Sequence, residues 1–230
     1  MKPKLVVLSG AGVSAESGIA TFRDAGGLWE GYDVMEVASI DGWYKNRKLV
    51  LDFYNMRRKQ ALSALPNDAH HIIAKLEEKF SVTVVTQNVD DLHEKADSTK
   101  VVHLHGELFK SRSIVDINLV YPVQGWELNE GDTCERGSQL RPNIVWFGEA
   151  VPLMSEAAKI VSKADVFIVV GTSLQVYPAA SLVDYVSDAA QQFVIDPQMP
   201  FIEKGNNMTL LETFATKGMR EVAKLLDKIF

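Results

Sequence analysis

The sequence is poor in the residues on which several protein classes depend. Its 230 residues include one cysteine, Cys134. One cysteine excludes an internal disulfide framework and a zinc site made of four cysteines of this chain. Acidic residues outnumber basic ones by 30 to 24, which argues against a general nucleic-acid or anionic-membrane binder. The chain also lacks internal repeats and low-complexity tracts.

Long apolar runs are absent as well. The longest strongly apolar stretch, Val166–Val170, is far shorter than the roughly 20 residues of a membrane-spanning helix. The apolar run Leu5–Leu8 is also too short for a signal peptide, whose core needs about 7–15 residues. We therefore interpret Leu5–Leu8 as a first strand, and we expect a cytoplasmic protein without nucleic-acid or membrane partners.

Short β-branched runs without polar alternation are frequent instead, and they are typical of strands buried on both faces of a parallel sheet. These runs are Leu5–Leu8, Val82–Val85, Val101–Leu104, Val166–Val170 and Phe193–Ile195. Segments with helical apolar spacing lie between or after them: Ala69–Lys79, Ser155–Ala164, Ala179–Ala190 and Met219–Ile229. This alternation predicts the α/β class, with a Rossmann-like doubly wound parallel sheet.

Two stretches break the alternation. Residues 31–68 look helical and aromatic, and residues 111–140 look irregular and rich in turn signals. We expect these two insertions to form a smaller lobe over the carboxyl ends of the strands. Residues 1–30, 69–110 and 141–230 then make up the larger Rossmann-like domain.

Polar clusters directly follow the predicted strands, where open α/β sheets bind ligands. The first begins with Gly10, Ala11 and Gly12. Glycines let a backbone approach a phosphate closely, although a plain tight turn explains them too. The spacing is not G-x-G-x-x-G, and no strand ending in an acid follows about 20 residues on. Ordinary hydride-transfer enzymes are therefore disfavoured.

Segments along nearly the whole chain resemble the sirtuins, the NAD-dependent protein-lysine deacylases. The segment Gly10–Asp24 is similar to their N-terminal signature. The match continues, in order and spacing, through Thr86–His93, His103–Gly106, Leu140–Glu149 and Gly171–Pro178. The resemblance implies NAD as co-substrate, acylated lysine side chains of proteins as partners, and nicotinamide and O-acyl-ADP-ribose as products.

His105 is the expected catalytic residue. It follows a predicted strand and precedes a glycine, and an imidazole titrates near neutrality, as suits a general base. The alternative for any single histidine is a hydrogen-bonded structural residue, which we expect of His103 because it alternates to the other side of the strand. The resemblance implies that His105 acts on the ribose hydroxyls.

The cofactor contacts are implied by the same resemblance, which assigns Gln87 and Asn88 to the ribose, Asp90 to the carboxamide, and Phe22 and Arg23 to the nicotinamide end. An Asx turn is the alternative for the loop containing Gln87–Asp90, and a helix cap is the alternative for the turn at Gly171–Ser173. The full expected set is Gly10, Ala11, Gly12, Ser14, Ala15, Thr21, Phe22, Arg23, Trp29, Gln87, Asn88, Val89, Asp90, Gly171, Thr172, Ser173, Asp196 and Met219.

Two members of this set depart from the family pattern or have a plain alternative. Asp196 ends a predicted strand, where a carboxylate can accept from two ribose hydroxyls and repel a 2′-phosphate, which favours NAD over NADP. Sirtuins usually carry Asn at this place. Met219 falls near the adenine-contacting position of the family, and a core residue is its alternative.

Two extended edges are expected to hold a substrate peptide as an added strand. They consist of Val145–Glu149 on one side, with Val145, Phe147 and Gly148 as the expected contacts, and of Val176 and Tyr177 on the other.

Tyr54 and Arg57 share one face of a predicted helix, and a phenol and a guanidinium together can hold a carboxylate. A solvated basic face is the alternative, because Arg58 and Lys59 follow. The segment Phe53–Arg57 resembles the desuccinylase and demalonylase subgroup, in which these two residues recognise the acyl carboxylate. We therefore expect removal of succinyl and malonyl groups, with acetyl as a possible second substrate.

Most sirtuins bind a structural zinc through two cysteine pairs in the insert after the catalytic histidine. Here that insert contains only Cys134 and no histidine, so we expect no zinc. We expect packing by Ile114, Ile117, Leu119, Tyr121 and Trp126 to hold the lobe instead, and Cys134 to be a leftover or surface thiol.

Two other functions stay open. The same pocket could serve ADP-ribosyl transfer or NAD hydrolysis, which product analysis separates from deacylation. A non-catalytic module that binds NAD or ADP-ribose is the third reading, although binding alone needs no base.

Overall fold

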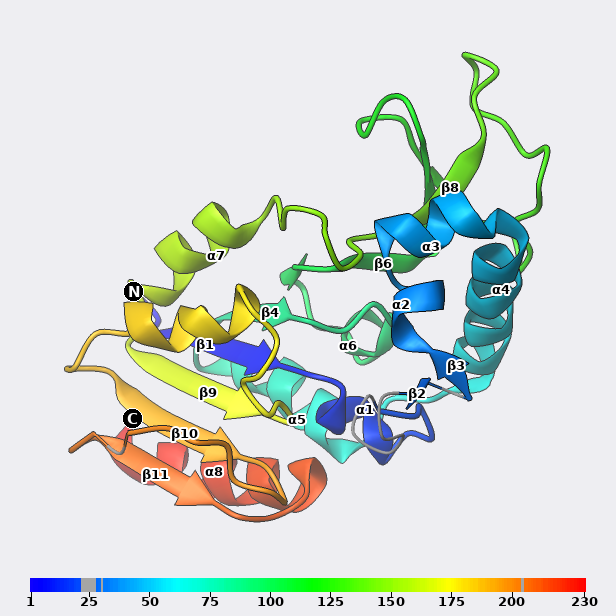
Figure 1. Cartoon of the computed structure of the whole chain (residues 1–230). Coiled ribbons are helices and arrows are strands. Elements are labelled where there is room, and N and C mark those ends of the chain that lie inside the picture. Colours follow the sequence, from blue (N-terminus) through cyan, green and yellow to red (C-terminus); the bar gives the residue numbers. More distant parts are fainter. Residues whose placement is uncertain (22–27, 30, 204) are drawn as a thin grey trace.

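The computed structural model describes residues 1–21, 28, 29, 31–203 and 205–230. Its larger part is built on a six-stranded parallel sheet (Figure 1). The strands are β1 (Lys4–Ser9), β4 (Ser81–Thr86), β5 (Val101–His103), β9 (Val166–Val170), β10 (Gln191–Ile195) and β11 (Met208–Leu211), in the order β11-β10-β9-β1-β4-β5. The chain runs outward from β1 to β5 and then restarts beside β1 with β9. This doubly wound order confirms the predicted fold class.

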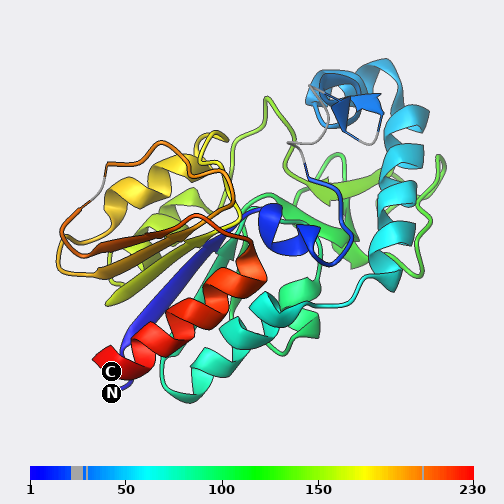
Figure 2. The same ribbon diagram turned by 90° about the horizontal axis from the view of Figure 1, so that it is seen from below.

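Helices cover both faces of this sheet, because its central strands are apolar on both faces. Every residue of β9 is buried, as are all residues of β1 and β4 except the first of each. One face packs against α5 (Asp68–Lys75) and α8 (Ala215–Ile229), which lie side by side in Figure 2. The other face packs against α7 (Met154–Val161) and the 3-10 segment η3 (Ala179–Tyr185). None of the described helices combines the length and apolar character that a bilayer crossing requires.

Some predicted elements differ in extent or type. The helix expected over Ala69–Lys79 is α5 followed by one 3-10 turn, η2 (Leu76–Glu78). The helix expected over Ala179–Ala190 is a 3-10 helix that ends at Tyr185. The Ser187 hydroxyl accepts from the N–H of Ala189 there and forms a turn in place of further helix. Strand β11 was not predicted.

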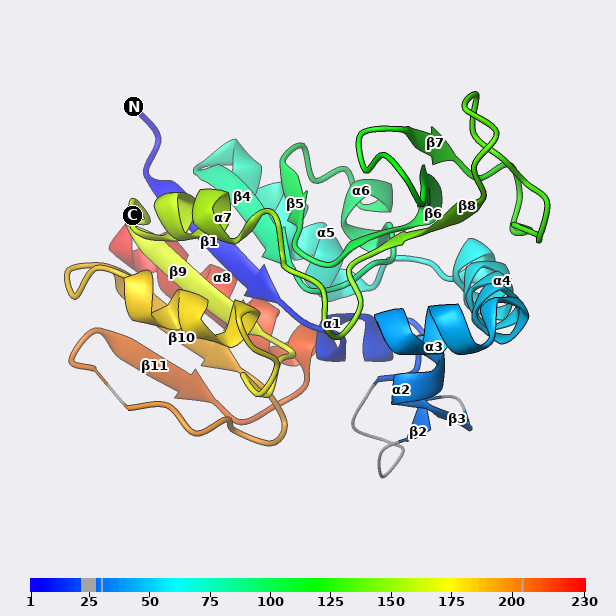
Figure 3. The same ribbon diagram turned by 45° about the horizontal axis from the view of Figure 1, so that its top comes forward.

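The smaller part contains a separate antiparallel sheet of β6 (Gly106–Ser113), β7 (Val120–Pro122) and β8 (Leu140–Ile144) (Figure 3). Beside it lie α2 (Val34–Val37), α3 (Ile40–Lys45), α4 (Arg47–Ser63) and a two-stranded ribbon of β2 (Leu28–Trp29) and β3 (Tyr32–Asp33). Two short helices, α1 (Gly12–Ala15) and α6 (Leu92–Lys95), follow β1 and β4. The predicted lobe limits at 110 and 141 fall inside β6 and β8, so the division into lobes stays a prediction.

The residues expected to hold the smaller lobe together are not its core. Ile114 and Ile117 are 43% and 65% exposed, because both lie in the loop between β6 and β7. The buried cluster includes instead side chains from β2, α2, α3, α4, β6, β8, the loop at Leu128 and the segment after β8, among them Trp43, Phe53 and Trp146. Cys134 is buried and contacts the Ser113 hydroxyl, so it is no surface thiol.

A buried guanidinium also ties α4 to the insert. Arg58 is 0% exposed; its Nε donates to the carbonyl of Trp126 at 2.8 Å and its Nη1 to that of Leu108 at 3.3 Å. Its Nη2 donates to the side chain of Asn55, which in turn exchanges two hydrogen bonds with the backbone of Leu128. Burial lowers the pKa of Arg58 to about 10, so the group stays charged at neutral pH. These bonds hold the insert in place by polar contacts to α4.

Replacing Arg58 with Met is expected to lower the free energy of unfolding by about 3 kcal/mol, because it leaves buried carbonyl groups without their donors. Urea denaturation measures this loss. Lys59→Met is the matched control, since Lys59 is exposed and its Nζ lies 5.1 Å from the ring centre of Trp126. Its cost should stay below about 1 kcal/mol. Equal losses in both variants would contradict the structural role of Arg58.

Candidate active site

The turns that leave β1, β4 and β9 meet at one edge of the sheet. Ser9 lies opposite Thr86 on one side and opposite Val170 on the other, so the residues that follow these three positions are neighbours. They line a cavity of about 630 Å³, which lies where the strand order reverses and extends to the smaller lobe. That volume is within the range of about 300–1,000 Å³ typical of small-molecule sites.

The glycine turn after β1 packs against the turn after β9. A Cβ at Gly10 would lie 2.7 Å from the Cβ of Thr172, and one at Gly12 would lie 2.7 Å from the Cα of Gly171. The N–H groups of Gly10 and Gly12 already donate to the carbonyls of Val170 and Gly171. These glycines are therefore needed for the contact between the two turns, and the helix that follows, α1, has only four residues.

The loop after β4 carries the amide and carboxylate groups. The Gln87 side-chain N–H donates to the hydroxyl of Thr172 at 3.0 Å. The Asn88 side-chain N–H donates to the hydroxyl of Ser14 at 3.1 Å, and that hydroxyl donates to a carboxylate oxygen of Asp90 at 3.1 Å. Burial raises the pKa of Asp90, while bonds from Leu92 and Ser14 lower it in part. The loop thus links the β1 and β9 turns across the cavity.

His105 lines the same cavity, and one of its ring nitrogens is already hydrogen-bonded to the backbone. Its Nδ1 lies 3.1 Å from the carbonyl oxygen of Gln87, and a carbonyl can only accept, so Nδ1 carries the proton. Burial lowers the pKa of His105, although the bond to Gln87 raises it in part. The ring is therefore neutral at pH 7, and its Nε2 has a lone pair that can take a proton.

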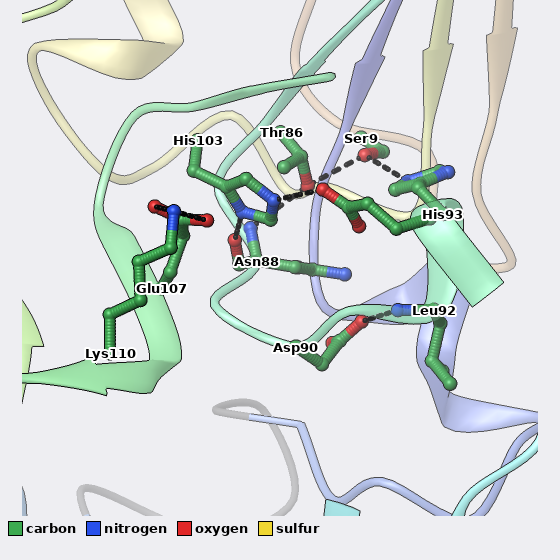
Figure 4. A network of polar contacts seen from close by, with 10 residues as sticks. Ser9, Thr86, Asn88, Asp90, Leu92, His93, His103, Glu107 and Lys110 are labelled. Carbon is green, nitrogen blue, oxygen red and sulfur yellow. Dashed lines mark hydrogen bonds and ion pairs between the residues drawn. The ribbon is translucent and has the colours of Figure 1, made fainter. Parts of the chain in front are cut away.

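His103, two residues before His105, has different hydrogen-bond partners and a different protonation state (Figure 4). Its Nδ1 lies 2.9 Å from the carbonyl of Asn88 and its Nε2 lies 2.7 Å from a carboxylate oxygen of Glu94. Both partners are acceptors, so both ring nitrogens donate and the ring is a cation. Burial lowers the pKa of His103, but the bond to Glu94 and its charge raise it overall. A histidine with both nitrogens donating cannot serve as a base.

Tyr54 and Arg57 lie on α4 and line the part of the cavity formed by the smaller lobe. Tyr54 is 1% and Arg57 6% exposed, so the alternative of a solvated basic face is wrong for Arg57. The Arg57 guanidinium carbon lies 4.7 Å from the ring centre of Trp29. The indole N–H of Trp146 donates to the Tyr54 hydroxyl at 2.9 Å.

The two predicted peptide edges flank the cavity, and Phe147 and Tyr177 are 41% and 73% exposed. The backbone of the first edge is already engaged. The N–H of Val145 donates to His105, that of Phe147 to Ala38, and that of Trp146 to the Glu149 side chain. The carbonyl oxygens of Trp146 and Phe147 also accept already, from the N–H groups of Glu149 and Ile40, so an added strand could pair here only by donating to the Val145 carbonyl or to a second lone pair of the other two.

Most residues predicted for the site line this one cavity. They are Gly10, Ala11, Gly12, Ser14, Ala15, Thr21, Trp29, Tyr54, Arg57, Gln87, Asn88, Val89, Asp90, His105, Val145, Phe147, Gly148, Gly171, Thr172, Ser173, Val176, Tyr177 and Asp196. Phe22 and Arg23 lie outside the described residues. Met219 is not among the lining residues; its side chain is 0% exposed in the core beneath the sheet, which corrects its prediction as an adenine contact. The apolar face of α8 holds it there.

Sequence reasoning missed two lining residues that bear on the site, Gln198 and Phe214. Trp146 and Glu149, which belong to the predicted edge Val145–Glu149, line the cavity as well. Gln198 and Phe214 follow β10 and precede α8, and no motif indicated them. Within the described ranges, no group of three or more His, Cys, Asp or Glu side chains could hold a metal ion.

Comparison with known proteins gives a consistent result. The model of the Sir2 family matches residues 10–178. The chain is 54% identical over 226 residues to an NAD-dependent protein deacylase of Helicobacter pylori, covering 97% of each chain, and 50% identical over 228 residues to one of Bacteroides thetaiotaomicron, covering 96% of this chain and 97% of the relative. A Sir2 homologue solved as an NAD complex superposes with a TM-score of 0.88 at 38% identity, covering 99% of this chain and 91% of that one. A family model that covers most of the chain, with relatives of this identity along almost its full length, shows that the chain belongs to the Sir2 family.

Proposed function

We propose that this protein is an NAD-dependent protein-lysine deacylase that removes succinyl and malonyl groups, with acetyl as a second substrate. One observation carries the proposal. A single cavity brings together three groups: His105 with its unprotonated Nε2, the amide and carboxylate loop at Gln87–Asp90, and the pair Tyr54 and Arg57. The first two suit a ribose and a carboxamide, and the third suits an anionic acyl group.

The residues present fit the co-substrate. The cavity is large enough for a dinucleotide and offers amides, hydroxyls and carboxylates along its length, with Asp196 beyond the glycine turns. NAD supplies, when bound, the ADP-ribosyl group that accepts the acyl group as nicotinamide leaves. Gln87 and Asn88 would bind the ribose, and Asp90 would accept from the carboxamide. Nε2 of His105 would take a proton from a ribose hydroxyl.

The direction of the hydrogen bond to the Tyr54 hydroxyl supports the acyl preference. An indole N–H can only donate, so the Tyr54 oxygen accepts from Trp146. Burial raises the pKa of Tyr54, so the phenol keeps its own proton. That proton can be donated to an acyl carboxylate, and Arg57 on the next turn of α4 adds the matching charge.

A panel of otherwise identical peptides bearing acetyl-, succinyl- or malonyl-lysine tests the proposal, with NAD present and the deacylated peptide followed by mass. We expect higher kcat/KM for the succinyl and malonyl peptides than for the acetyl peptide. The reverse order would contradict the acyl preference while leaving the deacylase activity in place. No NAD-dependent loss of any acyl group would contradict both.

Product analysis addresses the alternative of ADP-ribosyl transfer or NAD hydrolysis by the same pocket. Deacylation yields O-acyl-ADP-ribose together with free lysine. Transfer yields ADP-ribosylated protein, and hydrolysis yields free ADP-ribose without any need for the acylated peptide. A non-catalytic binding module would release no nicotinamide when given both substrates.

Replacing Trp146 with Phe is expected to lower kcat/KM for the succinyl peptide about tenfold, because it removes the donor that orients the Tyr54 hydroxyl. The loss for the acetyl peptide should stay below about threefold, since acetyl has no carboxylate to bind. Trp43→Phe is the control, because Trp43 is buried in the same cluster with its ring 5.5 Å from that of Trp146. Equal losses on both peptides would leave Trp146 with a packing role alone.

The absence of zinc and the location in the cytoplasm also belong to this proposal. The lone Cys134 and the polar bonds of Arg58 support a lobe without zinc. Stoichiometric zinc in elemental analysis of the purified protein would overturn this.

A further inference from the structure

A chain of buried side chains runs beneath the loop that carries Gln87 and Asn88 (Figure 4). Nε2 of His93, on α6, lies 2.9 Å from the hydroxyl of Ser9 at the end of β1. That hydroxyl lies 2.8 Å from the hydroxyl of Thr86 at the end of β4, which accepts from the backbone N–H of Asn88 at 3.0 Å. His93, Ser9 and Thr86 are at most 1% exposed. The chain thus connects a buried imidazole to the backbone of the candidate ribose-binding loop.

A second imidazole, that of His70, bears on which group donates in each of these hydrogen bonds. His70 on α5 contacts His93 edge to face, with ring centres 4.9 Å apart. The backbone N–H of Asn67 donates to Nδ1 of His70, so the proton of the neutral ring is on Nε2. Burial lowers the pKa of His70 to about 4 and that of His93 well below its usual value, so both rings are neutral at pH 7.

Two arrangements of protons are then possible for His93. If Ser9 donated to His93, Nδ1 of His93 would carry the proton, and two buried N–H donors of adjacent rings would lack acceptors among the described residues. If His93 donates to Ser9, its Nδ1 carries no proton, and only the Nε2–H of His70 is a buried donor without an acceptor among the described residues. The Ser9 hydroxyl has one proton and donates it to Thr86, so it accepts from Nε2 of His93, as in the second arrangement.

We propose that His93 is a positioning residue for the cofactor-binding loop: it fixes the Ser9 hydroxyl, which fixes Thr86, which holds the N–H of Asn88. The Gln87 carbonyl in the same loop holds Nδ1 of His105. The same chain of hydrogen bonds therefore fixes the position of the side-chain amides that would bind the ribose. Through the Gln87 carbonyl it also fixes the orientation of the His105 ring. This inference rests on the proposed use of NAD, and it adds a residue that lies outside the cavity lining.

An apolar side chain would fill this buried place without the cost of desolvating an imidazole. Replacing His93 with Leu keeps much of the volume and removes the donor. Replacing it with Gln keeps an N–H donor that can reach Ser9. Replacing Thr86 with Val keeps the shape and removes the acceptor of the Asn88 N–H, which is then a buried donor without its partner.

The test measures the Kd for NAD by calorimetry, the KM for NAD and for the acyl peptide, and the Tm of each variant. We expect His93→Leu and Thr86→Val to weaken NAD binding about tenfold, or about 1.4 kcal/mol, because the loop is then no longer held in its binding position before NAD arrives. The KM for the peptide should change less than about twofold, and His93→Gln should recover most of the loss. Val85→Ala is the matched control, since Val85 is buried on β4 and packs on the opposite face of the sheet from α5.

The outcomes separate the inference from the proposed function. Should Val85→Ala lose as much Tm as His93→Leu and bind NAD as the wild type does, the effect of His93 is specific. Should NAD affinity follow Tm across all variants, or His93→Gln be as impaired as His93→Leu, the inference is overturned and the proposed function stands. Should the unmodified protein bind no NAD, both are overturned. If His93→Leu does not fold, Thr86→Val decides the same question.

Discussion

Turnover of the acylated peptide is expected to fall by about 10²–10⁴-fold when His105 is replaced by Asn, the range typical of losing a general base. The Asn side-chain N–H can still donate to the Gln87 carbonyl, as Nδ1 of His105 does at 3.1 Å. What is lost is the nitrogen lone pair that, in the proposed function, takes the ribose proton. Affinity for NAD should change little, because the variant keeps the side-chain bond that holds the loop. Steady-state kcat and calorimetric Kd measure the two effects separately.

His71→Asn is the control for this experiment, because His71 is an exposed histidine of α5. This substitution is expected to leave kcat unchanged. Turnover retained by His105→Asn would show that another group is the base.

The pH profile gives an independent check of the same residue. Burial lowers the pKa of His105, so the ring takes up its inactivating proton at a lower pH than a free imidazole would. The acid limb of log kcat/KM is therefore expected below about pH 6.5. A limb above that value would contradict a neutral, desolvated base.

Desuccinylation is expected to fall about 100-fold when Arg57 is replaced by Met, whereas deacetylation should change less than about threefold. A charge-assisted hydrogen bond to a carboxylate contributes about 1.5–3 kcal/mol, and the Arg57 side chain is almost fully buried beside Trp29. Acetyl-lysine has no carboxylate and does not use this bond. The ratio of kcat/KM for succinyl to acetyl peptides is the quantity to measure.

Lys48→Met controls for the loss of one positive charge from α4. Lys48 is exposed, pairs with Asp52 and is absent from the cavity lining, so the ratio of the two activities should stay unchanged. Equal losses on both peptides in Arg57→Met would remove the argument for an anionic acyl group.

The sheet could be predicted because its signal is local. Runs such as Val166–Val170 are apolar at every position, short and rich in β-branched residues, which is typical of a strand covered on both faces. The meeting of polar turns at one edge then follows from parallel topology. The strand β11 and the antiparallel pairing of β6 with β8 could not be predicted, because short strands with mixed burial such as β11 carry little periodic signal.

The amino-acid sequence by itself determined the fold class, the family resemblance and the position of the imidazole beside the amide loop, since each depends on residue types at fixed spacing along one chain. Only the tertiary structure decided the surroundings of each side chain: Glu94 pairs with His103, the Gln87 carbonyl binds Nδ1 of His105, Trp146 donates to Tyr54, and Met219 is buried in the core. A partner's identity depends on which distant side chains are brought within hydrogen-bonding distance, and burial and packing settle that only when the chain is folded.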